Sequence, residues 1–90
     1  MSDMTRIGKY LTVHGGELLP GRKTRAWEVQ GNGGDVLGTV QWYGAWRQYT
    51  FDPTPGTTFN RDCLIDLANF LRRVNDEHRA ALRKADEAAP

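Results

Sequence analysis

Few side chains in this chain have the chemistry of catalytic groups or metal ligands. The 90 residues include one cysteine, Cys63, and two histidines, His14 and His78. A thiol near a helix N-terminus can become a reactive thiolate, and histidines serve as bases or metal ligands. The histidines are far apart, without a second ligand at metal-site spacing, and Cys63 falls on an apolar stripe where a packing residue is expected. We therefore expect no catalytic residue, no metal and no cofactor, and a protein that is not an enzyme.

Two other patterns have ordinary structural explanations. The run Gly31-Asn32-Gly33-Gly34 resembles a phosphate-binding loop, but such a loop is followed by a helix and usually contains a lysine, whereas a strand follows here. A hairpin turn is the better interpretation. Asp62 and Asp66 are i,i+4 neighbours on a predicted helix, and because no acid–base partner points at them, a solvated helix face accounts for them.

Aromatic side chains offer better binding chemistry. Tyr43 and Trp46 are predicted to pair at a hairpin tip on the polar face of a sheet, where large exposed rings are costly unless something covers them. Either the predicted loop over residues 14–23 covers them, using Leu18 and Leu19, or a partner does. Because tyrosine and tryptophan are favoured anchors of protein interfaces, both explanations stay open.

Arginines form a second candidate surface. Arg72 and Arg79, with Arg61 and Arg83, lie on one side of the predicted helix, opposite its apolar stripe. Such a stripe can hold phosphates or an acidic partner, or it can be a solvated face balanced by Asp76. The candidate partner-binding residues are Tyr43, Trp46, Gln48, Arg47, Arg72 and Arg79. The candidate phosphate contacts are Arg22, Lys23 and Arg25, at the edge of the predicted sheet.

A predicted antiparallel hairpin positions the two rings. Residues 36–43 and 46–51 are rich in β-branched and aromatic side chains, and Gly44-Ala45 between them fits a two-residue type II′ turn. This turn places Trp46 opposite Tyr43, and Arg47 opposite Trp42 in a cation–π contact. Side chains alternate along a strand, so one face is polar and the other faces the core. The predicted core face holds Val36, Gly38, Val40, Trp42, Tyr49 and Phe51.

Two more strands complete a meander. Residues 25–30 lead into a turn at 31–35 that contains an Asn-Gly pair, a common hairpin signal. That turn places Val29 opposite Val36. Residues 9–13 add a fourth strand, since Leu11 and Val13 alternate with polar neighbours.

A helix over residues 61–83 is predicted to cover the core face. Asn60 is a suitable N-cap, and Phe59 and Leu64 fit a hydrophobic staple. The apolar stripe of this helix comprises Cys63, Leu64, Leu67, Phe70, Leu71, Val74, His78 and Leu82. The predicted fold class is therefore α+β: an antiparallel three- to four-stranded meander (about 9–13, 25–30, 36–43 and 46–51) packed on one C-terminal α-helix. Residues 1–83 form a single domain, and residues 84–90 form a frayed tail.

Composition limits the location and the type of partner. The net charge is +1, from 12 basic and 11 acidic residues, which excludes a strong whole-molecule field for nucleic acids or membranes but allows a local patch. One cysteine cannot form an internal disulfide, as is typical of a reducing compartment. Residues 1–9 have no apolar run of the signal-peptide type, and no stretch approaches the roughly 18 apolar residues of a membrane span. We therefore expect a cytoplasmic protein without a membrane partner.

The hairpin and the helix contain a characteristic set of residues: Leu37-Gly38, Trp42-Tyr43, Trp46-Arg47, Tyr49, Phe51 and Pro53, followed by Phe59, Cys63-Leu64, Leu67 and Phe70. This set resembles that of a group of short proteins from bacteriophages, prophages and bacterial genomes. The resemblance covers residues 27–75. It implies a phage or mobile-element accessory protein and transfers no functional residue to this chain.

Three binding hypotheses follow. The first is a non-enzymatic module that binds a protein through the sheet face around Tyr43, Trp46 and Gln48. The alternative is nucleic-acid binding, with Arg22, Lys23, Arg25 and Arg47 on phosphates and the rings stacked on bases. The third is a homodimer that pairs sheet faces or edges.

Overall fold

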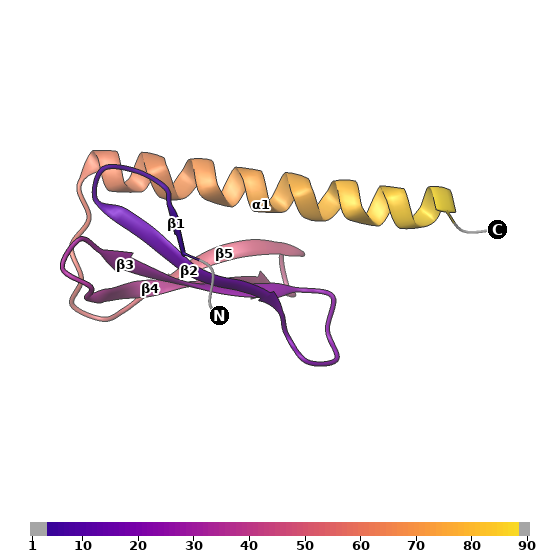
Figure 1. Ribbon diagram of the computed structural model, residues 1–90, viewed down its shortest axis with the longest axis horizontal. Helices are drawn as coiled ribbons and strands as arrows, with labels where there is room; N and C mark the ends of the chain where they lie inside the picture. Colours follow the sequence, from indigo (N-terminus) through magenta and orange to yellow (C-terminus); the bar gives the residue numbers. More distant parts are fainter. Residues whose placement is uncertain (1–3, 89–90) are drawn as a thin grey trace.

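The protein consists of one antiparallel sheet and one long helix (Figure 1). The structure is a computed structural model and describes residues 4–88. The five strands are β1 (Met4–Arg6), β2 (Leu11–Leu18), β3 (Arg25–Gly31), β4 (Val36–Tyr43) and β5 (Gln48–Pro53), and the helix is α1 (Arg61–Ala88). Their spatial order is β1-β2-β3-β4-β5, with every neighbouring pair antiparallel. The predicted α+β meander with a C-terminal helix is confirmed.

The N-terminal part of the sheet is larger than predicted. A fifth strand, β1, pairs with β2 and places Thr5 opposite Val13. The predicted loop at residues 14–23 is wrong in its first half, because β2 continues to Leu18. An irregularity in the β2–β3 register explains the difference: Gly15 and Gly16 have positive φ angles of 109° and 92°, which glycine adopts readily. A β-bulge therefore keeps residues with a loop-like composition inside a strand.

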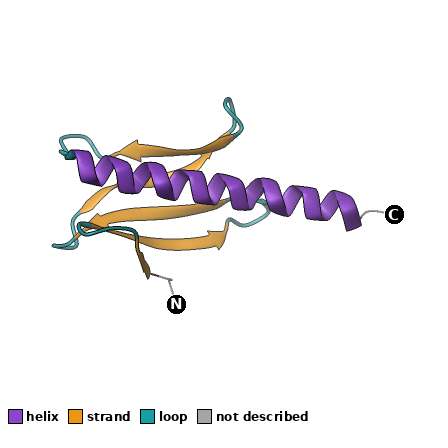
Figure 2. Ribbon diagram, turned by 90° about the horizontal axis from the view of Figure 1, so that it is seen from above, coloured by secondary structure: helices purple, strands orange, loops and turns teal. Residues whose placement is uncertain are grey.

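Helix α1 lies across one face of the sheet (Figure 2), and no other element among residues 4–88 covers the opposite face (Figure 1). The core between the two layers comprises Leu11, Val13, Val29, Val40, Tyr49, Cys63, Leu67, Phe70 and Val74. The Trp27 ring stands edge-on to both Tyr49 and Phe70, with ring centroids 5.3 Å apart in each pair. Edge-to-face pairs of this kind stabilise a core beyond the area that they bury, by about 0.5–1.5 kcal/mol each.

The β4–β5 hairpin has a longer turn than predicted. Tyr43 pairs with Gln48 and Trp42 with Tyr49, so four residues, 44–47, connect the strands. The predicted type II′ turn and its Tyr43–Trp46 strand pair are wrong, because the positive φ falls on Arg47, at 53°, and not on the glycine. The register therefore differs from the prediction by two residues. Since side chains alternate with a period of two, this displacement leaves Val40, Trp42, Tyr49 and Phe51 on their predicted face.

The β3–β4 hairpin differs from the prediction at its turn. Val29 lies opposite Gly38 instead of Val36, and Val36 pairs with Gln30 across a register shift. The irregularity exposes Val36 and allows Leu37 to pack against the core, the reverse of the prediction. Gly38 also has a packing role. A Cβ atom there would lie 2.6 Å from the Phe51 ring and 2.5 Å from the carbonyl oxygen of Asp52.

Helix α1 begins as predicted and ends later. The Asn60 side chain accepts a hydrogen bond of 2.8 Å from the Cys63 N–H, which confirms the N-cap. The 28 residues of α1 correspond to about 42 Å at 1.5 Å per residue, whereas an eight-residue strand spans about 26 Å. The C-terminal part of α1 therefore projects beyond the sheet (Figure 1).

This projection corrects two predictions. Residues 84–88, predicted as a tail, continue the helix, while residues 89–90 of the predicted tail lie outside the described part of the chain. Leu82, predicted on the buried stripe, is 47% exposed, and the hollow beside it is lined by residues of α1 alone. Leu64 is also exposed, because it lies on the flank of the stripe, while Cys63 and Leu67 point to the core.

We expect Gly38→Ala to destabilise the protein by about 1–3 kcal/mol, because the new methyl group meets both a ring and a backbone oxygen. Urea unfolding followed by circular dichroism measures the change. Gly44→Ala is the matched control, since a Cβ at Gly44 meets nothing within 4 Å, and its effect should stay within about 0.5 kcal/mol. Equal stability of the two variants would contradict the packing role of Gly38.

Candidate binding surface

Two large rings lie together at the tip of the β4–β5 hairpin. Tyr43 ends β4 and Trp46 lies in the turn, with ring centroids 5.1 Å apart and planes at 87°. The turn holds this arrangement, because the Trp46 N–H donates to the Tyr43 carbonyl at 3.2 Å. Tyr43 is 46% exposed and Trp46 is 67% exposed. The structure thus brings the two predicted rings together on the surface, through the turn and not through strand pairing.

The loop between β2 and β3 leaves the ring pair uncovered. This loop covers residues 19–24 and is closed on itself by two backbone hydrogen bonds of 3.0 Å, Leu19 N–H to Thr24 O and Arg22 N–H to Leu19 O. Leu18, one of the two side chains predicted to cover the rings, is the last residue of β2 and is itself exposed. The first explanation for the two large rings, that this loop covers them, therefore does not apply.

A groove runs between β5 and α1, and we call it the β5–α1 groove. It is lined by Trp46, Gln48, Tyr49, Thr50 and Phe51 on the sheet side, and by Leu71, Arg72, Asn75, Asp76 and Arg79 on the helix side. Its volume is about 540 Å³ and it is open to solvent, which suits a segment of a partner better than an enclosed small molecule. The candidates Trp46, Gln48, Arg72 and Arg79 therefore share one surface.

The other two candidates lie outside this groove. Tyr43 lines a neighbouring hollow that also contains Trp42, Trp46 and Asp52. Arg47 is exposed at the hairpin tip, and its predicted cation–π contact with Trp42 is wrong. The longer turn places Tyr49 opposite Trp42, and the Trp42 ring contacts the His78 ring with centroids 4.6 Å apart.

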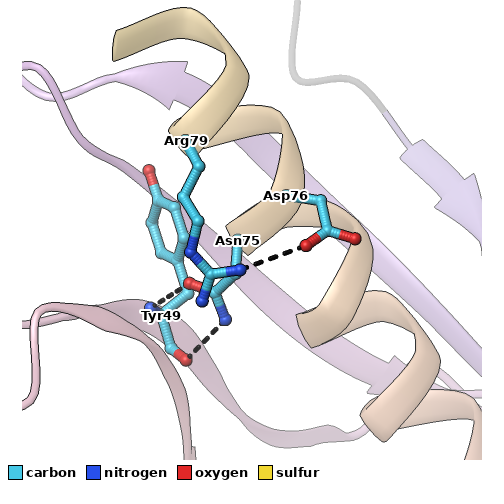
Figure 3. A network of polar contacts seen from close by, with 4 residues as sticks. All are labelled: Tyr49, Asn75, Asp76 and Arg79. Carbon is cyan, nitrogen blue, oxygen red and sulfur yellow. Dashed lines mark hydrogen bonds and ion pairs between the residues drawn. The ribbon is translucent and has the colours of Figure 1, made fainter. Parts of the chain in front are cut away.

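Asn75 is the site residue that the sequence interpretation missed. It is 8% exposed, its side-chain oxygen accepts the Tyr49 N–H at 2.7 Å, and its side-chain amide donates to the Tyr49 carbonyl at 3.3 Å (Figure 3). Because β5 is an edge strand, its outward backbone groups need partners. Asn75 supplies them as a neighbouring strand would. The sequence did contain a signal for this role: Asn75 is a polar residue on the flank of the apolar stripe, four positions after Leu71 and three before His78.

Charges along the groove are unevenly paired. Arg79 donates to Asp76 with an Nη1–Oδ1 distance of 3.2 Å, and Arg73 pairs with Glu77 at 3.8 Å on another flank of the helix. Both pairs are exposed, so each contributes only about 0–1 kcal/mol to folding. Arg72 takes part in no ion pair with the side chains of residues 4–85. Asp76 therefore balances Arg79 and leaves the positive charge of Arg72 available to a ligand.

The three candidate phosphate contacts lie apart from the ring pair. Lys23 and Arg25 line a hollow on the other side of α1, with Glu77 and His78. The Arg25 guanidinium donates to the Gly16 carbonyl at 2.6 Å, and Arg22 is exposed in the β2–β3 loop. The structure thus does not bring these three cations to the groove that contains Trp46.

The potentially reactive side chains have structural contacts. Cys63 is buried in the core, His14 lies 3.3 Å from the Thr12 hydroxyl through Nε2, and His78 packs on Trp42. Among the side chains of residues 4–85, no group of three histidine, cysteine or acidic side chains gathers as metal ligands do. Within residues 61–88, helix α1 has no stretch that is both long and apolar enough to cross a lipid bilayer. The binding surface is therefore the strongest functional feature.

Comparison with known proteins identifies a phage relative. The "Uncharacterized 9.3 kDa protein" of Acholeplasma phage L2 is 30% identical over 61 residues, which are 67% of this chain and 78% of the phage protein. This chain belongs to the family of that phage protein. No family model and no solved structure matches the chain. The predicted link to phage proteins is confirmed at this level, whereas the aromatic motif of the hairpin stays a prediction as a family signature.

For this member of the phage family, we expect Asn75→Ala to lower stability by about 1–3 kcal/mol. The substitution leaves the Tyr49 N–H and carbonyl without partners in a buried position. Asn69→Ala is the matched control, because Asn69 is an exposed asparagine of the same helix. Chemical unfolding of the two variants measures the difference, and a loss no larger than that of the control would show that Asn75 does not hold β5.

Proposed function

We propose that this protein is a small, non-enzymatic binding module that acts through protein–protein interaction, as an accessory or regulatory protein of a phage or mobile element. The observation that carries the proposal is the exposed pair formed by Tyr43 and Trp46 at the hairpin tip. Exposed large rings are costly in a protein that has no partner for them, and such rings are typical anchors of interfaces. The phage relative supports the biological setting.

The contacts of the reactive groups support the non-enzymatic part. Cys63, His14 and His78 are separated in the fold, and each contacts structural neighbours instead of another reactive group. A nucleophile and a base within hydrogen-bonding distance are the usual signature of covalent catalysis. The aromatic tip and the groove beside it are therefore the parts that we assign to function.

Nucleic-acid binding is the second candidate, because Arg72 and Arg79 line the same groove as Trp46. A base can stack on the indole while the guanidinium groups contact phosphates. Asp76 in the same groove and a net charge of only +1 weaken this reading. The salt dependence of binding separates the two candidates, since affinity for nucleic acid falls steeply as salt increases.

We expect Trp46→Ala to abolish retention of a protein partner from a nuclease-treated lysate of the native host, while the folded circular dichroism spectrum is unchanged. Wild-type protein and Ile65→Ala should both retain that partner, because Ile65 is exposed on α1 and does not line the groove. Mass spectrometry of the retained proteins gives the result.

Two results of this experiment would contradict the proposal. One is a partner retained equally by wild-type protein and by Trp46→Ala. The other is material that is retained from an untreated lysate and not from the nuclease-treated one, which would favour the nucleic-acid candidate.

A second copy of the chain is the remaining alternative as the occupant of the ring pair. Binding of a different protein predicts a mass near 10.2 kDa in light scattering at micromolar concentration. A mass near twice that value, reduced to the monomer value by Trp46→Ala, would show that the rings serve self-association.

A further inference from the structure

The β5–α1 groove has a chemical character that narrows the kind of partner. Its apolar part is formed by the Trp46 and Phe51 rings and by Leu71, whose side chain is half-buried. Its polar rim is formed by arginines of α1. An apolar floor beside a basic rim is complementary to a segment that carries both a large apolar side chain and a carboxylate.

The charges of the helix make the rim positive. Arg72 and Arg79 line the groove, and Asp76 pairs with Arg79 at 3.2 Å, so one positive charge is left at Arg72. Arg83 adds a second positive charge in the adjoining hollow, which it shares with Asp76, Arg79 and Leu82. The chain as a whole is almost neutral, so this flank of the helix is a local positive patch. A guanidinium group can also bind a carboxylate with two parallel hydrogen bonds.

The backbone of β5 decides how an occupant is held. The Tyr49 N–H and carbonyl point away from β4 and are already bonded to Asn75. The Thr54 N–H donates to the Leu37 carbonyl of β4. Because backbone groups alternate in direction along a strand, the N–H and carbonyl groups of even-numbered residues point toward β4, and those of odd-numbered residues point toward the groove. Pro53 has no N–H. Phe51 is therefore the one position of β5 with a free outward N–H and carbonyl, which is too little for pairing with another strand.

This edge argues against a second copy as the occupant. An edge-to-edge dimer needs a row of free backbone groups on each β5, and Asn75 and Pro53 interrupt that row. Side-chain recognition in the groove requires no such row. The contacts available to an occupant are the rings, Leu71 and the guanidinium of Arg72.

We infer that the β5–α1 groove binds an acidic peptide segment of the partner protein, in which a carboxylate contacts Arg72 and a neighbouring large apolar side chain packs between Trp46 and Leu71. This inference rests on the proposed protein-binding function and adds the chemistry of the partner. The groove would thus select peptides in which an acidic residue lies beside a large apolar residue. The hairpin tip would add contacts between the peptide and the sheet side of the groove.

A peptide selection tests this inference without knowledge of the natural partner. The full chain is immobilised and challenged with a library of random 12-residue peptides at physiological salt. Enriched peptides should contain an excess of aspartate and glutamate together with a large apolar residue. A representative peptide should bind Arg72→Glu at least tenfold more weakly than the wild type, which corresponds to about 1.4 kcal/mol.

The matched control is the neighbouring residue in sequence. Arg73→Glu introduces the same charge change, but Arg73 pairs with Glu77 and does not line the groove, so it should bind the peptide within about twofold of the wild type. Replacing the acidic residue of the peptide by lysine should restore binding to Arg72→Glu and weaken binding to the wild type.

Several outcomes would overturn the inference. They are the absence of any enriched peptide, enrichment of basic or uncharged peptides, and equal loss of binding in Arg72→Glu and Arg73→Glu. A single-stranded oligonucleotide that binds through Arg72 when no peptide does would assign the groove to nucleic acid instead.

The inference and the proposed function fail in different ways. If Trp46→Ala abolishes peptide binding and Arg72→Glu does not, the protein-binding role stands and the acidic chemistry is wrong. If neither substitution changes peptide binding, both the protein-binding role of this surface and the acidic chemistry of the partner are wrong.

Discussion

The fold depends on Tyr49, which connects three strands and the helix. Its backbone is bonded to Asn75 of α1, its hydroxyl accepts the Arg25 N–H of β3 at 3.0 Å, and its ring contacts Trp27 and Trp42. A small domain has little apolar surface to bury, so a residue that combines polar and apolar contacts has a large share in its stability. Tyr49 therefore helps to hold α1 against β5, and it also lines the groove between them.

The fold class could be predicted because the alternation of side chains tolerates errors in register. The predicted β4–β5 pairing was displaced by two residues, yet Trp42, Tyr49 and Phe51 still reach the core side, since the displacement is an even number. An error of one residue would have inverted both faces. The four-residue turn escaped prediction because Arg47 adopts a positive φ, which is unusual for a residue other than glycine.

The sequence predicted the individual residues of the site, but it did not predict how the rings and the arginines lie relative to one another. The exposure of Tyr43 and Trp46 follows from strand alternation and turn position, which are local properties. That Arg72 and Arg79 face Trp46 depends on the angle at which α1 crosses the sheet, and local sequence does not determine that angle. Asn75 was missed for the same reason. Its side chain bonds to the backbone of β5, and only the tertiary structure brings that strand edge next to Asn75.

The overhang of α1 divides the helix into two mechanical parts. The segment up to Val74 and Asn75 is fixed to the sheet by packing and hydrogen bonds, whereas the C-terminal end of α1 projects beyond the sheet (Figure 1), and there Leu82 and Arg83 line a hollow formed by residues of α1. A helical segment without tertiary contacts is close to marginal in water, so its last turns can open while the domain stays folded. A ligand that covered Leu82 and the neighbouring arginines would order this segment, and part of its binding energy would be spent on that ordering.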